Sequence, residues 1–205
     1  MKIVWMGILF LATAASMLIP GGAFAEPVNS VNLGIGGVIR LMPHCKANVY
    51  FAEYEHLVNP KIAVLGRASE VSYKFDDGTY YEKGRPKGVD LGARFYPAGN
   101  MQGFFIGGTL GYWMADWTFA RNMGKSNELQ GTGDTDSVRL NVDIGGRFPI
   151  GSSSVSIMPA LNVGKFFSTN ACEYTAPASR VGTACSQTTE VTYYVFLAVT
   201  AGVAF

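Results

Sequence analysis

The chain has 205 residues, of which 48% are hydrophobic and only 15% are charged. Its 16 basic and 15 acidic residues give a net charge of +1, so we expect no extended basic surface of the kind that holds nucleic acid. The length suits a single domain, and we expect no nucleic-acid partner.

Residues 1–25, MKIVWMGILFLATAASMLIPGGAFA, have the organisation of a secretory signal peptide. Lys2 precedes an apolar run over residues 3–19, a Pro-Gly-Gly breaker follows, and Ala-Phe-Ala at 23–25 supplies small residues before the cut. An uncleaved membrane anchor is the alternative, but a run of 17 apolar residues is at the short end for a spanning helix. We therefore predict a cleaved signal peptide over 1–25 and one domain over 26–205.

The domain shows apolar residues at every second position, which is the period of a β-strand. In the clearest segment, 138–148, Val138, Leu140 and Val142 share one face and Arg139 and Asp143 lie on the other. Eight such segments follow one another, at residues 31–41, 48–56, 62–75, 89–96, 104–114, 138–148, 155–164 and 193–205. A change of parity near Ser69 predicts a β-bulge in the third segment.

The connections between these segments alternate in length. The second, fourth and sixth are short and rich in turn residues, whereas the third, fifth and seventh are long and polar; the first is the exception. Outer-membrane barrels combine short periplasmic turns with long external loops, and their strands need roughly 9–11 residues to cross the bilayer. We therefore predict an all-β fold, an eight-stranded antiparallel up-and-down transmembrane β-barrel, with external loops at 120–136 and 168–189.

The polar face of the strands carries charges of both signs and many glycines. Such a face makes a poor soluble surface, but it suits the narrow interior of a barrel whose apolar face meets lipid. Buried charges must be paired, so we predict an internal ion-pair network. Its predicted members are Glu53, Glu55, Asp90, Arg94, Arg139, Asp143 and Arg147.

These features resemble the small outer-membrane β-barrel proteins of Gram-negative bacteria, a group that includes the membrane domain of OmpA and the OmpX and OmpW families. The resemblance rests on the signal segment, the eight alternating strands and the terminal VTYYVFLAVTAGVAF; GVDLGARFYP and GFFIGGTLGYW also resemble such domains. It implies an outer-membrane location, contact with outer-membrane lipid and insertion by the barrel-assembly machinery. It also implies that the last strand is the assembly signal, with Phe205, Val203 and Tyr193 among its alternating residues.

The three cysteines fit an exported protein better than a metal site. Cys172 and Cys185 can close a disulfide after export, which leaves Cys45 over. Their spacing is not that of metal ligands, and His44 and His56 are the only histidines. We expect no metal and no cofactor.

Three functions are compatible with this sequence. The first is a closed or nearly closed monomeric barrel that acts through its external loops, in adhesion, partner binding or envelope integrity. The second is a narrow channel for small or apolar solutes, with inward aromatics such as Trp113 and Tyr194 as its lining. The third is an enzyme that modifies lipid A, for which His44 and Asp116 are the nearest candidates. No nucleophile, base and orienting group fall together, so we expect no enzyme.

Overall fold

The computed structural model describes residues 28–38, 44–125, 128–176 and 188–205, and most of them lie in β-strands. The predicted signal peptide lies outside the described residues. The strands are β1 (Asn29–Val38), β2 (Cys45–Asn59), β3 (Ile62–Asp76), β4 (Tyr80–Gly84), β5 (Lys87–Phe95), β6 (Gly103–Arg121), β7 (Leu129–Pro149), β8 (Val155–Ala176) and β9 (Thr188–Ala204). Within the described ranges, no helix is long and apolar enough to cross a membrane.

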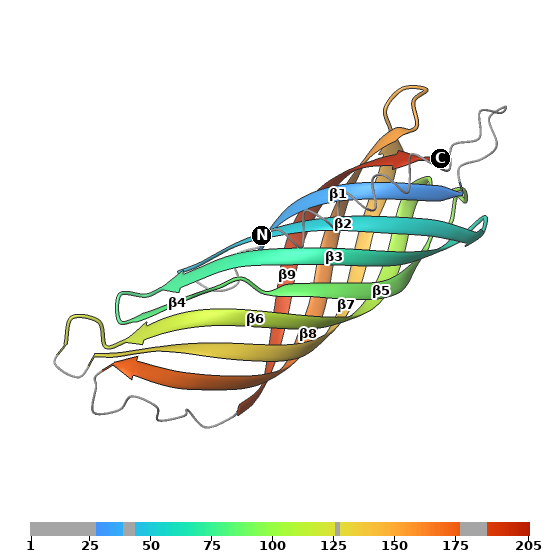
Figure 1. The fold of residues 1–205 in the computed structure, drawn as a ribbon. Helices are drawn as coiled ribbons and strands as arrows, with labels where there is room; N and C mark the ends of the chain where they lie inside the picture. The colour runs from blue at the N-terminus through green and yellow to red at the C-terminus, as the bar shows by residue number, and fades with distance from the viewer. Residues whose placement is uncertain (1–27, 39–43, 126–127, 177–187) are drawn as a thin grey trace.

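The strands form a single antiparallel ring (Figure 1). β1 pairs with β2 on one side and with β9 on the other, so the sheet closes and both edges are covered. β4 and β5 lie end to end between β3 and β6, because Pro86 has no N–H to donate to the ladder. The Pro86 carbonyl still accepts a 2.8 Å hydrogen bond from the Val71 N–H. With β4 and β5 counted as one, the ring has the eight predicted strands, which confirms the fold prediction.

The ring has two different ends. The turns that join β2 to β3, β5 to β6 and β7 to β8 are short and lie beside the start of β1 and the end of β9; we call this the turn end. At the first of these turns the Asn59 side chain accepts 2.9 Å hydrogen bonds from the backbone N–H groups of Lys61 and Ile62. The opposite end, which we call the hairpin end, carries the longer connections.

The outer face of the ring is apolar over the turn-end half of the strands. Leu91 is 73% exposed, Ile35 63% and Val89 61%, and similar residues follow around the whole ring. In water, a side chain of this kind that stays exposed lacks the roughly 1.5–3 kcal/mol of stabilising free energy that its burial would contribute. A complete band of such side chains therefore indicates a lipid environment. We call this surface the lipid band.

Beyond the lipid band the pattern of the strands reverses. On β6 the outward positions change from Met114 to Asp116, and on β7 they change from Val138 to Asp136. The inward positions become aromatic, with Trp117 and Phe119 in ring contact at 5.4 Å. This upper part has polar residues outside and mainly aromatic residues inside, which is the usual pattern of a β-structure in water. Its inward Glu82 and Thr135 accept hydrogen bonds from Tyr73 and Trp117. We call it the extension; its described part comprises residues 72–87, 116–125, 128–136 and 169–176.

The predicted external loops are shorter than expected. β6 continues to Arg121 and β7 begins at Leu129, so most of 120–136 is strand, and β8 continues to Ala176. The prediction relied on an apolar outer face, which is lost where the strands leave the lipid. The bulge predicted near Ser69 is also wrong. β3 pairs with β2 without interruption from Phe75 to Ala63, because Leu65, before Ser69, already faces the interior.

Candidate functional site

The interior at the level of the lipid band is filled by eight charged side chains, which we call the charge cluster. Strand alternation points all of them inward, and each is at most 5% exposed. Four are arginines and four are carboxylates, so the cluster is neutral when all are ionised. Its members are Arg67, Arg94, Arg139, Arg147, Glu53, Glu55, Asp90 and Asp143.

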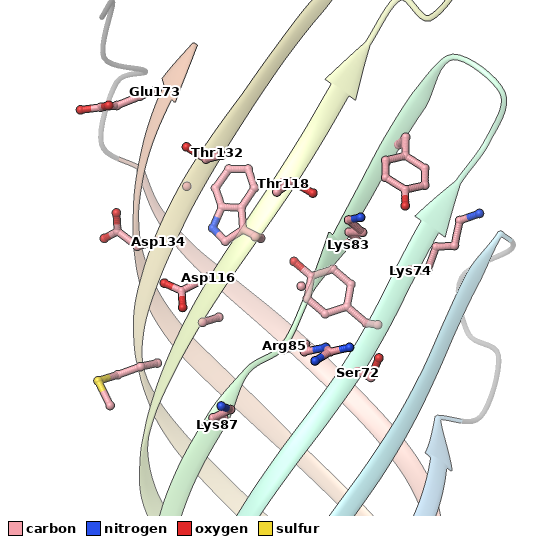
Figure 2. A pocket seen from close by; sticks show the side chains of 17 residues that line it. Ser72, Lys74, Lys83, Arg85, Lys87, Asp116, Thr118, Thr132, Asp134 and Glu173 are labelled. Carbon is pink, nitrogen blue, oxygen red and sulfur yellow. The ribbon is translucent and has the colours of Figure 1, made fainter. Parts of the chain in front are cut away.

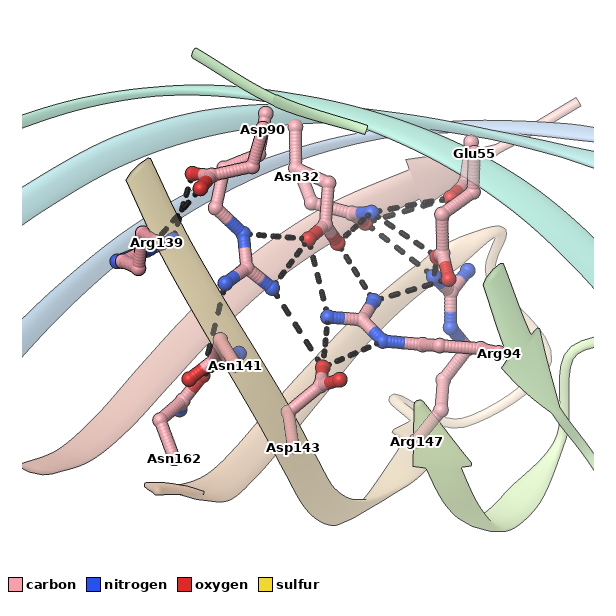
Figure 3. A network of polar contacts seen from close by, with 12 residues as sticks. Asn32, Glu55, Asp90, Arg94, Arg139, Asn141, Asp143, Arg147 and Asn162 are labelled. Carbon is pink, nitrogen blue, oxygen red and sulfur yellow. Dashed lines mark hydrogen bonds and ion pairs between the residues drawn. The ribbon is translucent and has the colours of Figure 1, made fainter. Parts of the chain in front are cut away.

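Arg94 of β5 lies at the centre of the charge cluster (Figure 3). Its Nη1 donates to Glu53 at 2.6 Å and to Glu55 at 2.9 Å, both on β2. Its Nε and Nη2 donate to one oxygen of Asp143, on β7, at 2.7 and 2.5 Å. One guanidinium therefore joins three strands across the interior, with charge-assisted hydrogen bonds to three carboxylates.

Arg67 of β3 gives the same carboxylates a second cation. Its Nε and Nη2 donate to one oxygen of Glu53 at 2.9 and 2.7 Å, and Nη2 reaches Asp143 at 3.5 Å. Its Nη1 also donates to the Asn162 side chain on β8 at 3.5 Å. These contacts extend the cluster to the far wall of the ring.

The part of the cluster nearest the turn end is built around Glu55. Arg147 forms an ion pair with Glu55, and Tyr96 donates a 2.8 Å hydrogen bond to the same carboxylate. Ser30 and Asn32 of β1 each donate to it at 3.2 Å. These donors satisfy the carboxylate in an interior that water does not reach freely.

The part nearest the hairpin end is a separate pair. Arg139 donates to both oxygens of Asp90, at 2.9 and 2.5 Å, in the bidentate geometry that suits a guanidinium. Trp113 adds a 3.1 Å hydrogen bond to Asp90, and its ring lies 4.4 Å from the Arg139 guanidinium carbon. The pair is thus held on one side by an aromatic face.

Apolar layers close the interior on both sides of the cluster. Towards the turn end, Tyr96, Met101, Phe105 and Met158 form a packed group with exposures of 2% or less. Towards the hairpin end, Val49, Phe51, Phe196 and Ala198 form a second group. Charged and apolar side chains therefore occupy the interior in successive layers.

Glycines make room for the carboxylates. A Cβ at Gly107 would overlap an oxygen of Asp143 and lie 2.7 Å from Cγ of Arg94. A Cβ at Gly111 would overlap Asp90 in the same way. The inward glycines of β6 are therefore required by close approach of the cluster rather than by an unusual backbone conformation.

All seven charged residues of the predicted network are buried inside the ring, with Asp90 and Arg139 as a pair separate from the other five, and the structure adds Arg67 to those five. Sequence reasoning missed Arg67 because the third strand was read as changing parity near Ser69. A constant parity, with Leu65, Arg67 and Ser69 on one face, would have placed it inside.

The remaining predicted residues are spread over the ring. Cys185 and the Cys172 side chain lie outside what the structure describes, so the predicted disulfide stays a prediction. Cys45 has a free thiol at the start of β2, where partial burial and the nearby Glu82 carboxylate raise its pKa. His44 precedes β2 and Asp116 lies outward on β6, with β3 and β4 between them. Among the described residues, no group of His, Cys, Asp and Glu is suited to a metal ion.

The residues of the predicted assembly signal lie on β9 and at its end. Tyr193 and Val203 are outward and 68% and 47% exposed. The Phe205 N–H donates a 2.8 Å hydrogen bond to the Asn29 carbonyl, and its own carbonyl accepts one from the Asn29 N–H at 2.9 Å. These bonds continue the seam between β9 and β1. The assembly role itself stays a prediction.

No protein-family model matches the sequence, and no curated protein matches it. Solved structures do. A major outer membrane protein from Thermus thermophilus has a TM-score of 0.53 at 13% identity, over 86% of this chain and 99% of that one. Acinetobacter baumannii CarO2 has a TM-score of 0.51 at 10% identity, over 88% and 100%.

The translocator domain of autotransporter NalP from Neisseria meningitidis also has a TM-score of 0.51 at 10% identity, over 97% of this chain and 68% of that one. At such identities the likeness is one of fold. It agrees with the closed ring, the apolar outer band and the polar interior described above. The chain has the fold of the small outer-membrane β-barrels.

Proposed function

We propose that this chain is a closed barrel that does not conduct solutes, and that its biological role is carried by the extension on the cell surface. The observation that supports this proposal is the charge cluster, whose ion pairs run from wall to wall across the interior. Arg94 alone links β5 to β2 and β7. A solute passing through would have to break several buried ion pairs, each of which costs roughly 3–5 kcal/mol once one partner is left alone.

The alternative, a narrow channel for small or apolar solutes, has less support. The inward aromatics considered as its lining are engaged in packing. The Trp113 ring lies 5.6 Å from that of Phe166, and the Tyr194 ring lies 5.8 Å from that of Phe196. Phe105 belongs to the apolar layer at the turn end. An interior of eight strands is narrow enough for side chains to fill it.

The extension supports a surface role. β7 and β8 have 21 and 22 residues, about twice the roughly 9–11 that cross a bilayer. The surplus forms a polar wall above the lipid band, so adhesion, partner binding and support of the envelope are the roles that fit it. We propose a monomer, because the closed ring has no free edge to pair with a second copy. The proposal assigns no catalytic role to His44, His56 or Asp116.

Swelling of liposomes in an iso-osmotic L-arabinose solution tests the closed interior. Liposomes that contain the wild-type barrel should swell no faster than protein-free liposomes. A variant with Glu53, Arg67, Arg94 and Asp143 all replaced by alanine loses two charges of each sign and should swell faster. Arabinose-driven swelling of wild-type liposomes would overturn the proposal.

Folding of both proteins is checked by the gel mobility of unboiled samples. If the four-residue variant does not fold, Asp90→Ala combined with Arg139→Ala removes one balanced pair and serves as the second variant. The wild-type result decides the proposal in either case.

A further inference from the structure

The outward face of the extension carries four cations on adjoining strands. Lys74 lies on β3, Lys83 on β4, Arg85 directly after β4 and Lys87 at the start of β5 (Figure 2). All four are exposed. We call them the basic patch.

The basic patch begins where the lipid band ends. Lys87 is the next outward residue after Val89, about 7 Å along the strand at roughly 3.3 Å per residue. It is paired in register with Met114, the last large apolar residue on the outward face of β6. The patch therefore lies at the depth of lipid headgroups, whereas Val89 and Met114 lie at the depth of acyl chains.

The cations of the patch are only partly compensated by the protein, and Glu70 lies directly opposite Lys87 in the ladder. Lys74 pairs with Asp76 at 3.2 Å, with both side chains largely in solvent. Among the described residues, neither Lys83, Arg85 nor Lys87 forms an ion pair or a side-chain hydrogen bond. Lys74 and Lys83 also lie directly opposite each other in the ladder, an arrangement of like charges that destabilises a sheet unless an anion lies between them.

The patch forms one side of an open hollow on the outer wall of the extension. The hollow has a volume of about 1200 Å³ and continues across β6 and β7 to β8. Asp116 on β6 lies next to Arg85, and the carboxylates of Asp134 and Glu173 lie on the far side. The volume is at least as large as the roughly 300–1,000 Å³ of typical small-molecule sites.

We propose that the basic patch binds the phosphate groups of a phosphorylated glycolipid in the outer leaflet. Its position next to the lipid band brings a lipid phosphate to these cations while the acyl chains lie against Val89 and Met114. Lysine and arginine are the residues that bind phosphate, by point charge and by bidentate hydrogen bonds respectively. The carboxylates on the far side repel phosphate and accept hydrogen bonds from sugar hydroxyls, which orients the headgroup.

This inference rests on the membrane placement of the proposed function and not on whether the interior conducts. The test uses the full barrel, refolded in detergent micelles that contain bisphosphorylated lipid A. Lipid that stays with the protein through gel filtration is quantified by mass spectrometry. The patch variant combines Lys83→Gln, Arg85→Gln and Lys87→Gln.

The matched control combines Lys61→Gln, Arg121→Gln and Lys125→Gln, which removes three exposed charges outside the patch. Wild type and control should retain lipid A equally, and the patch variant should retain about tenfold less, since tenfold is what a loss of 1.4 kcal/mol gives. Lipid A without phosphates should be retained no better by wild type than by the patch variant.

Equal retention of bisphosphorylated lipid A by patch variant and control would overturn the inference. Release of the lipid from wild type by millimolar inorganic phosphate alone would also overturn it, because the site would then be one for free phosphate. Gel mobility confirms that each variant is folded. If the patch variant retains lipid A as well as the control does, and wild-type liposomes do not swell, the lipid-binding inference is wrong but the closed-barrel proposal is unaffected. The two proposals can therefore fail independently.

Discussion

Replacement of Arg94 by methionine tests the charge cluster at its centre. Methionine has a similar length and keeps an apolar contact with the Phe105 ring, which lies 4.6 Å from the guanidinium carbon. What the substitution removes is the cation shared by three buried carboxylates. The remaining members of the cluster then carry one uncompensated negative charge inside the barrel.

The expected loss follows from the burial of these groups. Arg94 and its carboxylate partners have side-chain exposures of 3% or less, so solvent does not screen the charge left behind. Removal of one partner of a buried ion pair costs roughly 3–5 kcal/mol. This is a large share of the roughly 5–15 kcal/mol by which domains are stable, so the free energy of unfolding should fall measurably.

A second substitution restores the balance of charge. Asp143 has Arg94 as its close cation, and its remaining contact with Arg67 is 3.5 Å long. Asp143→Asn in the Arg94→Met background should therefore recover part of the lost stability, with a coupling of roughly 0.5–3 kcal/mol. Urea unfolding in detergent micelles, followed by tryptophan fluorescence, measures each variant.

The exposed Arg121 is the matched control, because its guanidinium carbon lies near an aromatic ring at 5.7 Å but outside the cluster. Arg121→Met should leave the unfolding midpoint close to that of wild type. A loss below about 1 kcal/mol for Arg94→Met, or a double variant whose losses simply add, would refute the account of a balanced cluster.

Three further predictions concern packing, a turn and a thiol. Gly107→Val should destabilise the barrel by roughly 1–3 kcal/mol. Gly108→Val should cost less, because Gly108 faces outward and a Cβ added there has no atom closer than 3.8 Å. Equal losses of stability in urea unfolding would contradict this. Backbone N–H groups of the β3–β4 turn hold the pKa of Asp77 below its ordinary value. The stability that its carboxylate contributes is therefore present above that ordinary value and is lost as the pH falls through the lowered pKa. Asp77→Ala should therefore destabilise at neutral pH, with a difference from wild type that shrinks in acid; a difference that grows in acid would contradict it. Glu82→Gln should lower the pKa of Cys45 and speed its reaction with iodoacetamide at neutral pH, measured with the other cysteines replaced by serine; an unchanged rate would show that the carboxylate is not the cause.

The alternating pattern was sufficient to predict the ring and the charged interior, because lipid imposes an apolar outer face. Segment 138–148 shows this most clearly: Val138, Leu140 and Val142 are outward, and Arg139 and Asp143 are buried. Once one face is assigned to lipid, every charge on the other face must find a partner inside. The pairing of Arg139 with Asp90 follows from the register of the strands, because both residues lie opposite Gly111 on β6.

The extension was not predictable by the same reasoning. Residues 129–136 contain no apolar outward side chain, since this part of β7 is in water, and their run of Gly, Thr and Asp is typical of a loop. The ladder with β6 continues there because the backbone pairs independently of which face is polar. Arg67 was missed because apolar residues line parts of the interior as well as the outer face. Leu65 and Val71, on either side of Arg67 in β3, both face inward.

The central claim is that the charge cluster closes the barrel, and single-channel recording in a planar bilayer tests it most directly. The wild-type barrel, inserted and shown to be folded by its gel mobility, should give no discrete current steps in concentrated potassium chloride. The variant that lacks Glu53, Arg67, Arg94 and Asp143 should give steps. Stable steps from the wild type, with a conductance that the four substitutions do not change, would contradict the claim.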